Sequence, residues 1–343
     1  MSIRRLVVQF GFVCLAVAAQ AETWSLSKVD TAGDVGRHAS VATRFGRTHI
    51  AYYDLTNKNL KYATSTDNLT WTIEVIDSAG DVGQFASITV DQKGNPHVAY
   101  YDATNQDLKY GVRGATWLTS VVDANAAGQY CSIGVDSAYF AHMSYLSSGS
   151  FSLKYARGKP GNWLTQIVDG VGSVGWGSSI AVDKNGFAHI SYNDNAANTL
   201  KYATNTSGLW VLTVVDPANG TAVHTSIALD SGGSPHIAYL RGGLRYARKS
   251  GAVWMTETVD ASIGFEEWSV SIEMNAANLP AISYCDGVVD DLKLARKLTN
   301  NTWDAIVIDP DAAGTWSSVA IDSNGRIRIA YFNGAADLRY AIN

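Results

Sequence analysis

The chain has 343 residues, a formal net charge of −5, and a composition that is 46% hydrophobic and 17% charged. A mildly acidic balance argues against nucleic acid as a partner, since recognition of phosphates calls for a basic patch. The length allows a large core, and three cysteines cannot build the disulfide framework of a small secreted scaffold.

The first element in chain order is an export signal, predicted for residues 1–21. Arg4 and Arg5 precede an uncharged apolar run over 6–19, and Ala19-Gln20-Ala21 provides a small-residue cleavage site. The run is too short for a membrane span, and no later segment approaches the roughly 20 apolar residues that a span requires. We therefore expect a mature protein of residues 22–343 that is soluble, secreted or periplasmic, and without a membrane span.

The rest of the chain repeats one unit of four short runs seven times. Each run is rich in Val, Ile and Tyr and bounded by Gly, Asn or Asp, which is typical of strands joined by turns. The first run begins at Trp24, Trp71, Trp117, Trp163, Trp210, Trp254 and Trp303. The second begins at Ser40, Ser87, Ser132, Ser179, Ser226, Ser271 and Ser318. The third carries Tyr52, Tyr100, Tyr145, Tyr192, Tyr239, Tyr284 and Tyr331. The fourth starts at Leu60, Leu108, Leu153, Leu200, Leu244, Leu292 and Leu338.

This repeat predicts the fold class: all-β, a seven-bladed β-propeller with four-stranded antiparallel blades. The small Ser-led run suits the crowded axis and the Trp-led run suits the rim, so we expect the order Ser, Tyr, Leu and Trp run from axis to rim. The chain then begins with an outer strand over 24–30 and ends with a third strand over 338–341. We expect these two to pair, so that the N-terminal strand completes the last blade.

One segment carries a family resemblance. Residues 65–71, Ser-Thr-Asp-Asn-Leu-Thr-Trp, approach the Asp-box pattern, although the glycine is missing and the other blades do not keep the motif. In its architecture the whole mature chain resembles secreted bacterial propellers with sialidase-like (BNR) repeats. A sialidase-like arginine triad is not expected, because Arg37 and Arg241 have no third arginine on their face.

Residues that depart from the repeat are the candidates for function. Five histidines open the third run in their blades and are expected to be structural, hydrogen-bonding the preceding turn: His49, His97, His142, His189 and His236. The other two histidines, and the three tryptophans outside the outer-strand phase, lie just before a Ser-led run. Every blade thus presents one ring at that point: His38, Phe85, Tyr130, Trp176, His224, Trp268 and Trp316.

Strands that alternate in direction place the loop after the Tyr run on the same face as these rings. That loop contributes Asp54, Asp102, Asp194 and Asp286, with Ser147, Arg241 and Asn333 in the remaining blades. The ring-bearing loops add Arg37, Gln84, Gln129, Glu266 and Glu267. Aromatic faces beside carboxylates and amides suit a neutral sugar, whose CH-rich faces stack on rings while its hydroxyls bind polar groups. We therefore expect a module that binds a glycan or an extracellular protein partner at this mouth; the alternative is that the rings only plug the channel.

Three alternatives stay open. A polysaccharide lyase could use His38 or His224 as general base, Tyr130 as acid, and Arg37 or Arg241 to neutralise a uronate. A glycoside hydrolase could instead use a pair among Asp54, Asp102, Glu266 and Glu267. The third alternative is a scaffold without a ligand site.

No cofactor is predicted from the motifs. The chain has no Asp-x-Asp-x-Asp-Gly run and no His/Cys cluster with metal-ligand spacing, although a Ca²⁺ held in the channel by several aspartates stays open. Cys131 and Cys285 belong to blades three and six, too far apart around the ring for a disulfide, and are expected to be buried.

Overall fold

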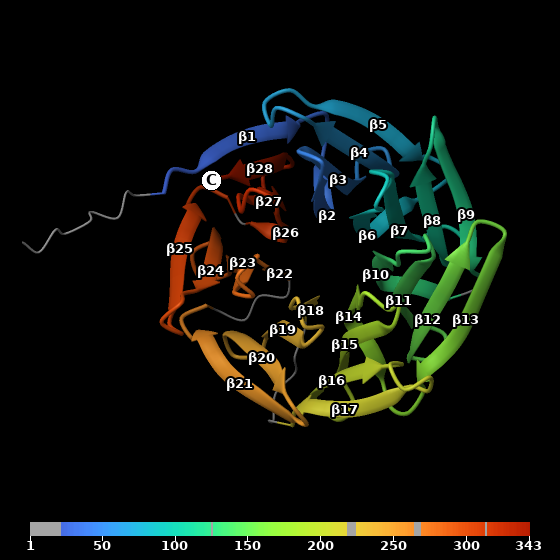
Figure 1. The fold of residues 1–343 in the computed structure, drawn as a ribbon. Helices are drawn as coiled ribbons and strands as arrows, with labels where there is room; N and C mark the ends of the chain where they lie inside the picture. Colours follow the sequence, from blue (N-terminus) through green and yellow to red (C-terminus); the bar gives the residue numbers. More distant parts are fainter. Residues whose placement is uncertain (1–21, 125, 218–223, 264–268, 313) are drawn as a thin grey trace, which may run out of the picture.

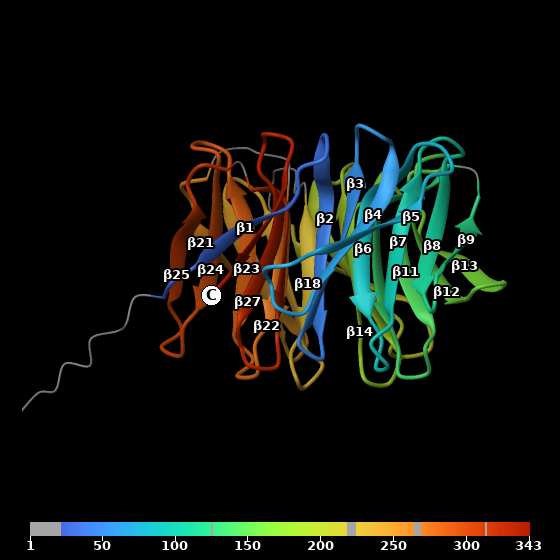
Figure 2. The same ribbon diagram turned by 90° about the horizontal axis from the view of Figure 1, so that it is seen from above.

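The computed structural model describes residues 22–124, 126–217, 224–263, 269–312 and 314–343. Within them, seven four-stranded antiparallel sheets stand around a central axis (Figures 1 and 2). The seven-bladed propeller predicted from the repeat is therefore confirmed. None of the described residues forms a helix long and apolar enough to cross a membrane. The predicted export signal, and the site candidates Glu266, Glu267 and Trp268, lie outside the described residues.

The strands fall into four sets, one for each position in a blade. The innermost strands are β2 (Val35–Arg44), β6 (Val82–Val90), β10 (Ala127–Val135), β14 (Val174–Val182), β18 (Thr225–Leu229), β22 (Val270–Met274) and β26 (Thr315–Ile321). The second strands are β3 (Arg47–Asp54), β7 (Pro96–Asp102), β11 (Ala141–Ser147), β15 (Ala188–Asp194), β19 (Pro235–Leu240), β23 (Pro280–Asp286) and β27 (Ile327–Phe332). The third strands are β4 (Asn59–Ser65), β8 (Asp107–Arg113), β12 (Ser152–Lys159), β16 (Thr199–Thr204), β20 (Leu244–Ser250), β24 (Asp291–Lys297) and β28 (Leu338–Ile342). The outer strands are β5 (Thr72–Asp77), β9 (Trp117–Asp123), β13 (Asn162–Asp169), β17 (Val211–Asp216), β21 (Val253–Asp260), β25 (Trp303–Asp309) and β1 (Ser25–Asp30).

We number the blades one to seven from β2–β5 onward, with β26, β27, β28 and β1 in blade seven. The Ser-led strands line the axis and the Trp-led strands form the rim, as the sequence predicted (Figure 1). The propeller has two faces. The face at which each inner strand begins is called the collar face, and the opposite face, which carries the turns between first and second strands such as β2–β3, is called the turn face. The collar face is at the top of Figure 2.

A ring of serines explains why every inner strand carries a serine at the same position. The serine Oγ in each blade accepts a backbone N–H from the inner strand of the next blade, at 3.1–3.2 Å, and the last of these bonds returns from blade seven to blade one. The members of this serine ring are Ser40, Ser87, Ser132, Ser179, Ser226, Ser271 and Ser318. Inner strands of neighbouring blades cannot pair as a sheet, and the hydroxyl satisfies a buried donor that would otherwise lack a partner.

The outer tryptophans hold adjacent blades together by packing against the tyrosine of the Leu-led strand in the preceding blade. Six such pairs are edge-to-face, with ring centroids 5.0–5.2 Å apart; Trp117 on Tyr62 is one example. This geometry is favoured by the aromatic quadrupole and adds to the area buried between blades.

A second contact between blades repeats in all seven. The aspartate that ends each outer strand accepts a hydrogen bond of 2.6–2.9 Å from the tyrosine hydroxyl of the second strand in the next blade. A Lys or Arg of that blade's third strand pairs with the same carboxylate. The Asp that closes the Trp run and the basic residue of the Leu run are thus parts of one buried ion pair.

The N-terminal strand β1 lies at the rim of blade seven, beside the last strand of the chain. It pairs antiparallel with β28, with Ser25 opposite Ile342 and Asp30 opposite Leu338. Asp30 at its end accepts from Tyr52 of blade one at 2.7 Å and pairs with Lys61. The first and last segments of the chain therefore meet at the same blade boundary (Figure 1).

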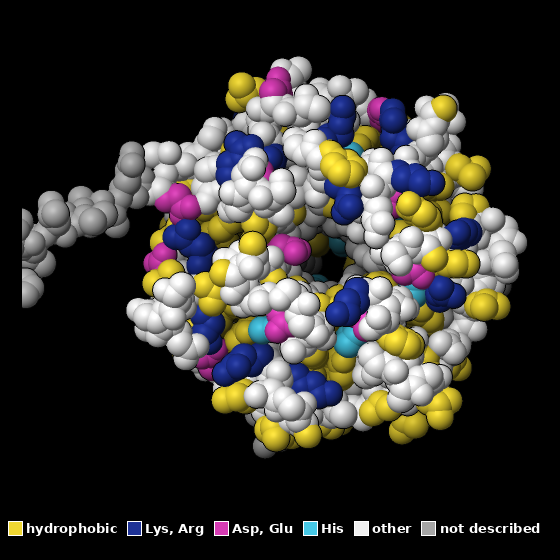
Figure 3. Space-filling view, in the orientation of Figure 1, with side chains coloured by type: hydrophobic (Ala, Val, Ile, Leu, Met, Phe, Trp, Pro, Cys, Tyr) yellow, Lys and Arg dark blue, Asp and Glu magenta, His cyan; other side chains and the backbone are white. Residues whose placement is uncertain are grey.

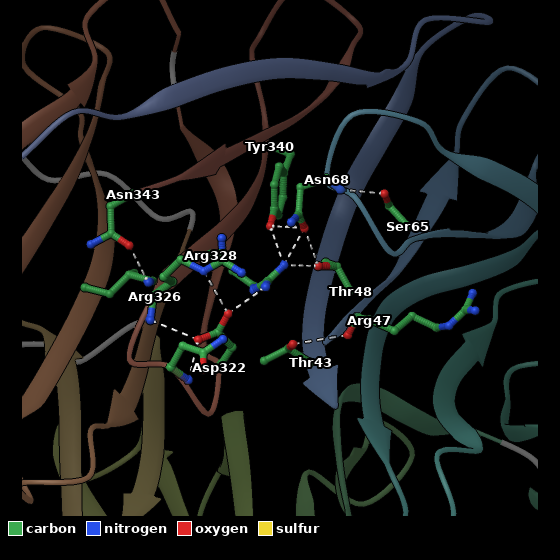
Figure 4. A network of polar contacts seen from close by, with 12 residues as sticks. Thr43, Arg47, Thr48, Ser65, Asn68, Asp322, Arg326, Arg328, Tyr340 and Asn343 are labelled. Atoms are coloured by element: carbon green, nitrogen blue, oxygen red, sulfur yellow. Dashed lines mark hydrogen bonds and ion pairs between the residues drawn. The ribbon is translucent and has the colours of Figure 1, made fainter. Parts of the chain in front are cut away.

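A buried arginine joins blade seven to blade one at the turn face. Arg328 is fully buried and donates to Asp322 at 2.6 Å, to Thr48 at 2.5 Å and to Asn68, the last two across the boundary between these blades (Figure 4). Tyr340 adds a contact of 3.1 Å to the same guanidinium. Arg328 stands where other blades carry a histidine, and its longer side chain reaches the neighbouring blade.

Candidate functional site

A cavity of about 560 Å³ occupies the channel where the inner strands begin. Its walls are the serine ring and a set of aromatic and imidazole side chains that we call the aromatic collar: His38, Phe85, Tyr130, Trp176, His224 and Trp316. The structure thus brings together every predicted ring that lies among the described residues. A central opening is also visible on the turn face (Figure 3).

The collar rings contact one another in sequence around the channel. The ring centroids of Trp316 and His38 are 5.1 Å apart, those of His38 and Phe85 4.8 Å, and those of Phe85 and Tyr130 4.6 Å. Tyr130 continues to Trp176 at 5.6 Å and approaches His224 at 6.2 Å. The collar is therefore a nearly continuous apolar rim, and each of its members remains half-buried rather than covered.

An unusual backbone conformation aims these rings at the channel. His38, Phe85, Tyr130 and Trp316 have φ between +50° and +54°, in the left-handed region that non-glycine residues rarely adopt. The pairing register shifts at this point of the inner strand, which marks a β-bulge. Such residues cost roughly 1–3 kcal/mol each and concentrate at functional sites.

In blade four a glycine, and not the aromatic residue, adopts the left-handed conformation. Gly177 takes the left-handed position there, with φ +55°, and Trp176 precedes it by one residue. The Trp176 ring consequently stacks nearly parallel to Phe151, at 13° and 6.4 Å, and its Nε1 donates to Ser173 at 3.0 Å. The sequence placed all rings two or three residues before the serine; only the structure shows that the two spacings give different orientations.

Glycines two residues before several of the left-handed rings allow this loop to pass close to the preceding blade. At Gly83, φ is +110° and a Cβ would lie 2.8 Å from the Cα of Leu60. A side chain there would collide with backbone, so the close approach requires glycine.

The four aspartates predicted at the mouth are buried and do not line the cavity. Asp54, Asp102, Asp194 and Asp286 are only 1–7% exposed, and none of them lines the cavity. Each carboxylate accepts a backbone N–H of its own turn at 3.0–3.1 Å. A lysine ammonium of the adjacent strand lies 2.8–3.7 Å from each. They hold the turns in place, so we build the candidate site on the collar and the serine ring.

The two candidate arginines are also engaged. Arg37 forms a bidentate pair with Asp34 at 2.8 and 3.0 Å, and its guanidinium lies 5.5 Å from the Trp316 ring centroid. Arg241 is buried, pairs with Asp216 at 3.1 Å and donates to the carbonyl of Asn198 at 3.1 Å. Neither lines the cavity.

The surroundings of the candidate catalytic residues indicate how well they could act as a base or an acid. Burial, followed by the nearby His224 and Arg37, lowers the pKa of His38 to about 3. A histidine with that pKa is neutral at physiological pH and a weak general base. Among the described residues no Asp or Glu lines this cavity, and none forms a group of three or more potential ligands with His or Cys that could hold a metal ion.

Three of the five histidines that were expected to be structural make the predicted hydrogen bond to the preceding turn, and all five make a contact that was not predicted. In blades two, three and five the imidazole Nε2 lies 3.1–3.5 Å from the aspartate of the preceding turn. The Nδ1 atoms of all five histidines lie 2.5–2.7 Å from a tyrosine hydroxyl of the third strand, a partner that the sequence did not suggest. Cys131 and Cys285 are buried, as expected.

The Asp-box-like segment over 65–71 forms a compact turn. The Asp67 carboxylate accepts from the backbone N–H groups of Leu69 and Thr70 at 2.9 and 2.8 Å and from the Ser65 hydroxyl at 2.9 Å. The turn also places Asn68, next to Asp67, in contact with Arg328 of blade seven.

Comparison with solved structures supports the architecture. A protein of unknown function from Dyadobacter fermentans aligns over 92% of this chain and 97% of its own, at 14% identity and a TM-score of 0.59. The Hadza microbial sialidase Hz136 aligns over 86% and 73%, at 12% identity and a TM-score of 0.56. The fucose-specific lectin of Aleuria aurantia aligns over 82% and 97%, at 16% identity and a TM-score of 0.55. No family model and no curated protein sequence matches this chain.

These likenesses concern the fold. The resemblance to sialidase propellers expected from the sequence is confirmed at the level of architecture, with identities too low to transfer residues. Propellers of this kind occur in lectins and in glycosidases, so the function must be argued from the site.

Proposed function

We propose that this protein is a non-catalytic glycan-recognition module, and that its aromatic collar binds a neutral sugar. The observation that carries the proposal is the collar itself: half-buried rings from six blades line one cavity of about 560 Å³. The volume lies within the range of small-ligand pockets. Pyranose CH faces stack on aromatic rings of this kind.

The serine ring supplies the polar part of the site. Each of its hydroxyls accepts a backbone N–H and keeps its own hydrogen, so it can donate to a sugar oxygen in the channel. The hydroxyls stand directly behind the rings along the inner strands. An apolar rim with hydrogen-bond donors beneath it offers both contacts that a neutral sugar needs.

The charges around the cavity favour a neutral ligand and binding without turnover. No Lys, Arg, Asp or Glu of the described chain lines it, and Arg37, next to His38 in the sequence, is already paired with Asp34. Glycoside hydrolysis requires a pair of carboxyl groups beside the bond. The collar therefore fits recognition better than cleavage.

A glycan array on residues 22–343, followed by titration of tryptophan fluorescence, tests the proposal. We expect saturable binding of neutral oligosaccharides and no release of reducing ends or unsaturated uronates. Trp176→Ala removes a ring without disturbing a left-handed residue and should weaken binding about tenfold or more. Phe45→Ala, which removes a 75% exposed ring on the turn face, is the control and should bind as the wild type.

Two results would overturn the proposal. One is the absence of any neutral glycan ligand; the other is binding that Trp176→Ala leaves unchanged. Turnover of a bound glycan would move the protein to the enzyme alternatives.

A further inference from the structure

Blade one breaks the histidine–carboxylate pairing of the repeat. In blades two to five, the histidine that opens the second strand faces an aspartate of the preceding turn, with Nε2 to Oδ2 distances of 3.1–3.8 Å. In blade one the histidine is kept as His49, but the turn before it reads Arg44-Phe45-Gly46-Arg47 and contains no carboxylate. The histidine that faces a turn aspartate in blades two to five thus has no carboxylate in its own turn in blade one.

A cavity of about 270 Å³ opens at this position on the turn face. It lies between blades one and two and is lined by Arg47, His49, Tyr62, Glu74 and Arg113, together with two threonines, Gly94 and Pro96. The size is near the lower end of the range for small-molecule sites, so it would take a single sugar ring or a short acid. Lys and Arg side chains are spread over the turn face that Figure 3 shows.

The hydrogen-bond pattern of the other blades indicates which nitrogen of His49 carries the hydrogen. In blades two, three and five the imidazole Nε2 is hydrogen-bonded to the turn carboxylate, so the neutral imidazole carries its hydrogen there and Nδ1 accepts from the tyrosine. His49 has the same Nδ1 contact, 2.6 Å from the Tyr62 hydroxyl. Its Nε2–H is therefore a donor, and none of the described carboxylates lies within ion-pair distance of it. The imidazole itself is only 2% exposed.

The charges that line the cavity leave one cation without a counterion. Arg113 is neutralised by a bidentate pair with Glu74, at 2.7 and 3.1 Å. Arg47 is exposed, pairs with none of the described carboxylates, and extends away from the Arg328 network (Figure 4). Burial, followed by the charges of Arg47 and Arg113, lowers the pKa of His49 to about 4. The cavity thus combines one neutral donor with one unpaired positive charge.

We propose that this cavity is a second ligand site, which binds the carboxylate group of a small acidic ligand such as a uronate sugar. The ligand's carboxylate takes the place that the turn aspartate occupies in blades two to five, accepting from His49 Nε2–H and pairing with Arg47. A singly charged anion matches the single unpaired cation. Thr72, an exposed residue of the lining, can contact the rest of the ligand through its hydroxyl. This site does not depend on the collar.

The test follows the imidazole signals of the protein by NMR during titration with glucuronate, acetate and glucose, with His49→Gln used to assign the His49 signal. Glucuronate should shift the His49 signal saturably and raise its pKa, because a nearby anion favours the charged imidazole. Acetate tests the carboxylate alone: a weaker response than to glucuronate assigns part of the affinity to the sugar ring, and an equal one assigns all of it to the carboxylate. Glucose should leave the signal unchanged.

Two variants distinguish specific binding at this site from nonspecific attraction of an anion to the basic turn face. Arg47→Gln should weaken glucuronate binding about tenfold, since it removes the charged partner. Lys184→Gln removes an exposed cation of the equivalent turn in blade four and should have no effect. The proposal is overturned if His49 does not respond to glucuronate, if glucose gives the same response, or if the two variants weaken binding equally.

Discussion

The buried ion pair at the junction of the chain's two ends gives the sharpest prediction about stability. Asp30 ends β1 in blade seven, and its carboxylate holds Lys61 and Tyr52 of blade one. Asp30→Asn keeps the shape and removes the charge. Lys61 is 8% exposed and would retain only Asp54, whose carboxylate lies 3.7 Å from the ammonium.

The magnitude follows from these contacts. Breaking a buried pair by removing one partner costs about 3–5 kcal/mol. The second carboxylate beside Lys61 reduces that loss, and we expect Asp30→Asn to lower the free energy of unfolding by about 2–3 kcal/mol at pH 7. A loss of that size corresponds to a fall in Tm of roughly 3–5 °C for a chain of this length.

The pH dependence supplies an independent check. Burial alone would raise the pKa of Asp30, but hydrogen bonds from Lys61 and Tyr52 hold it below its ordinary value. The stabilisation is therefore fully present above about pH 4 and is lost as the pH falls toward the lower pKa of the folded state. The gap between wild type and Asp30→Asn, measured by urea unfolding, should be constant near neutrality and narrow below about pH 4.

Lys28→Gln is the matched control on the same strand. The Lys28 side chain is 59% exposed and pairs with Asp337 at the surface, so its loss should cost less than about 1 kcal/mol. If Asp30→Asn costs no more than Lys28→Gln, or if its effect does not vary with pH, the assignment of a stabilising pair at this boundary is wrong.

Two further predictions concern the same blade boundary. Deletion of residues 22–30 exposes the edge of β28 and should lower Tm more than Asp30→Asn does, by roughly 10 °C or more, whereas an unchanged melting curve would show that β1 does not fasten the last blade. Arg328→Met should cost about 3 kcal/mol in urea unfolding, because it leaves Asp322 buried without its main partner. Arg326→Met, which removes a 48% exposed arginine from the same carboxylate, should cost under about 1 kcal/mol; equal losses would contradict the role given to burial.

The repeat in the sequence was sufficient to predict the architecture because each run must satisfy the same contacts in every blade. The serine within each inner strand and the tryptophan of each Trp-led run mark two of these contacts directly. The seven blades, the strand order and the gathering of the collar rings on one face followed from counting and from strand alternation.

The roles of individual polar residues did not follow in the same way. Asp54 looked like a ligand-binding group at the mouth, yet it caps its own turn beside Lys61. The sequence pattern can place a carboxylate near the mouth of the channel. It does not show whether a lysine from the neighbouring strand already neutralises that carboxylate. Arg241 was misleading for the same reason, since its partner Asp216 belongs to the preceding blade.

The sequence alone thus determined what is periodic in this protein, because a seven-fold repeat of one pattern allows only one closed arrangement of sheets. The tertiary structure alone decided which departures from the pattern leave a group unsatisfied. His49 shows the difference: the sequence shows that the turn before it has no carboxylate, but only the structure shows that no other described carboxylate takes that place and that a cavity lies beside the imidazole. Contacts between blades join residues far apart in the chain, and no local pattern records them.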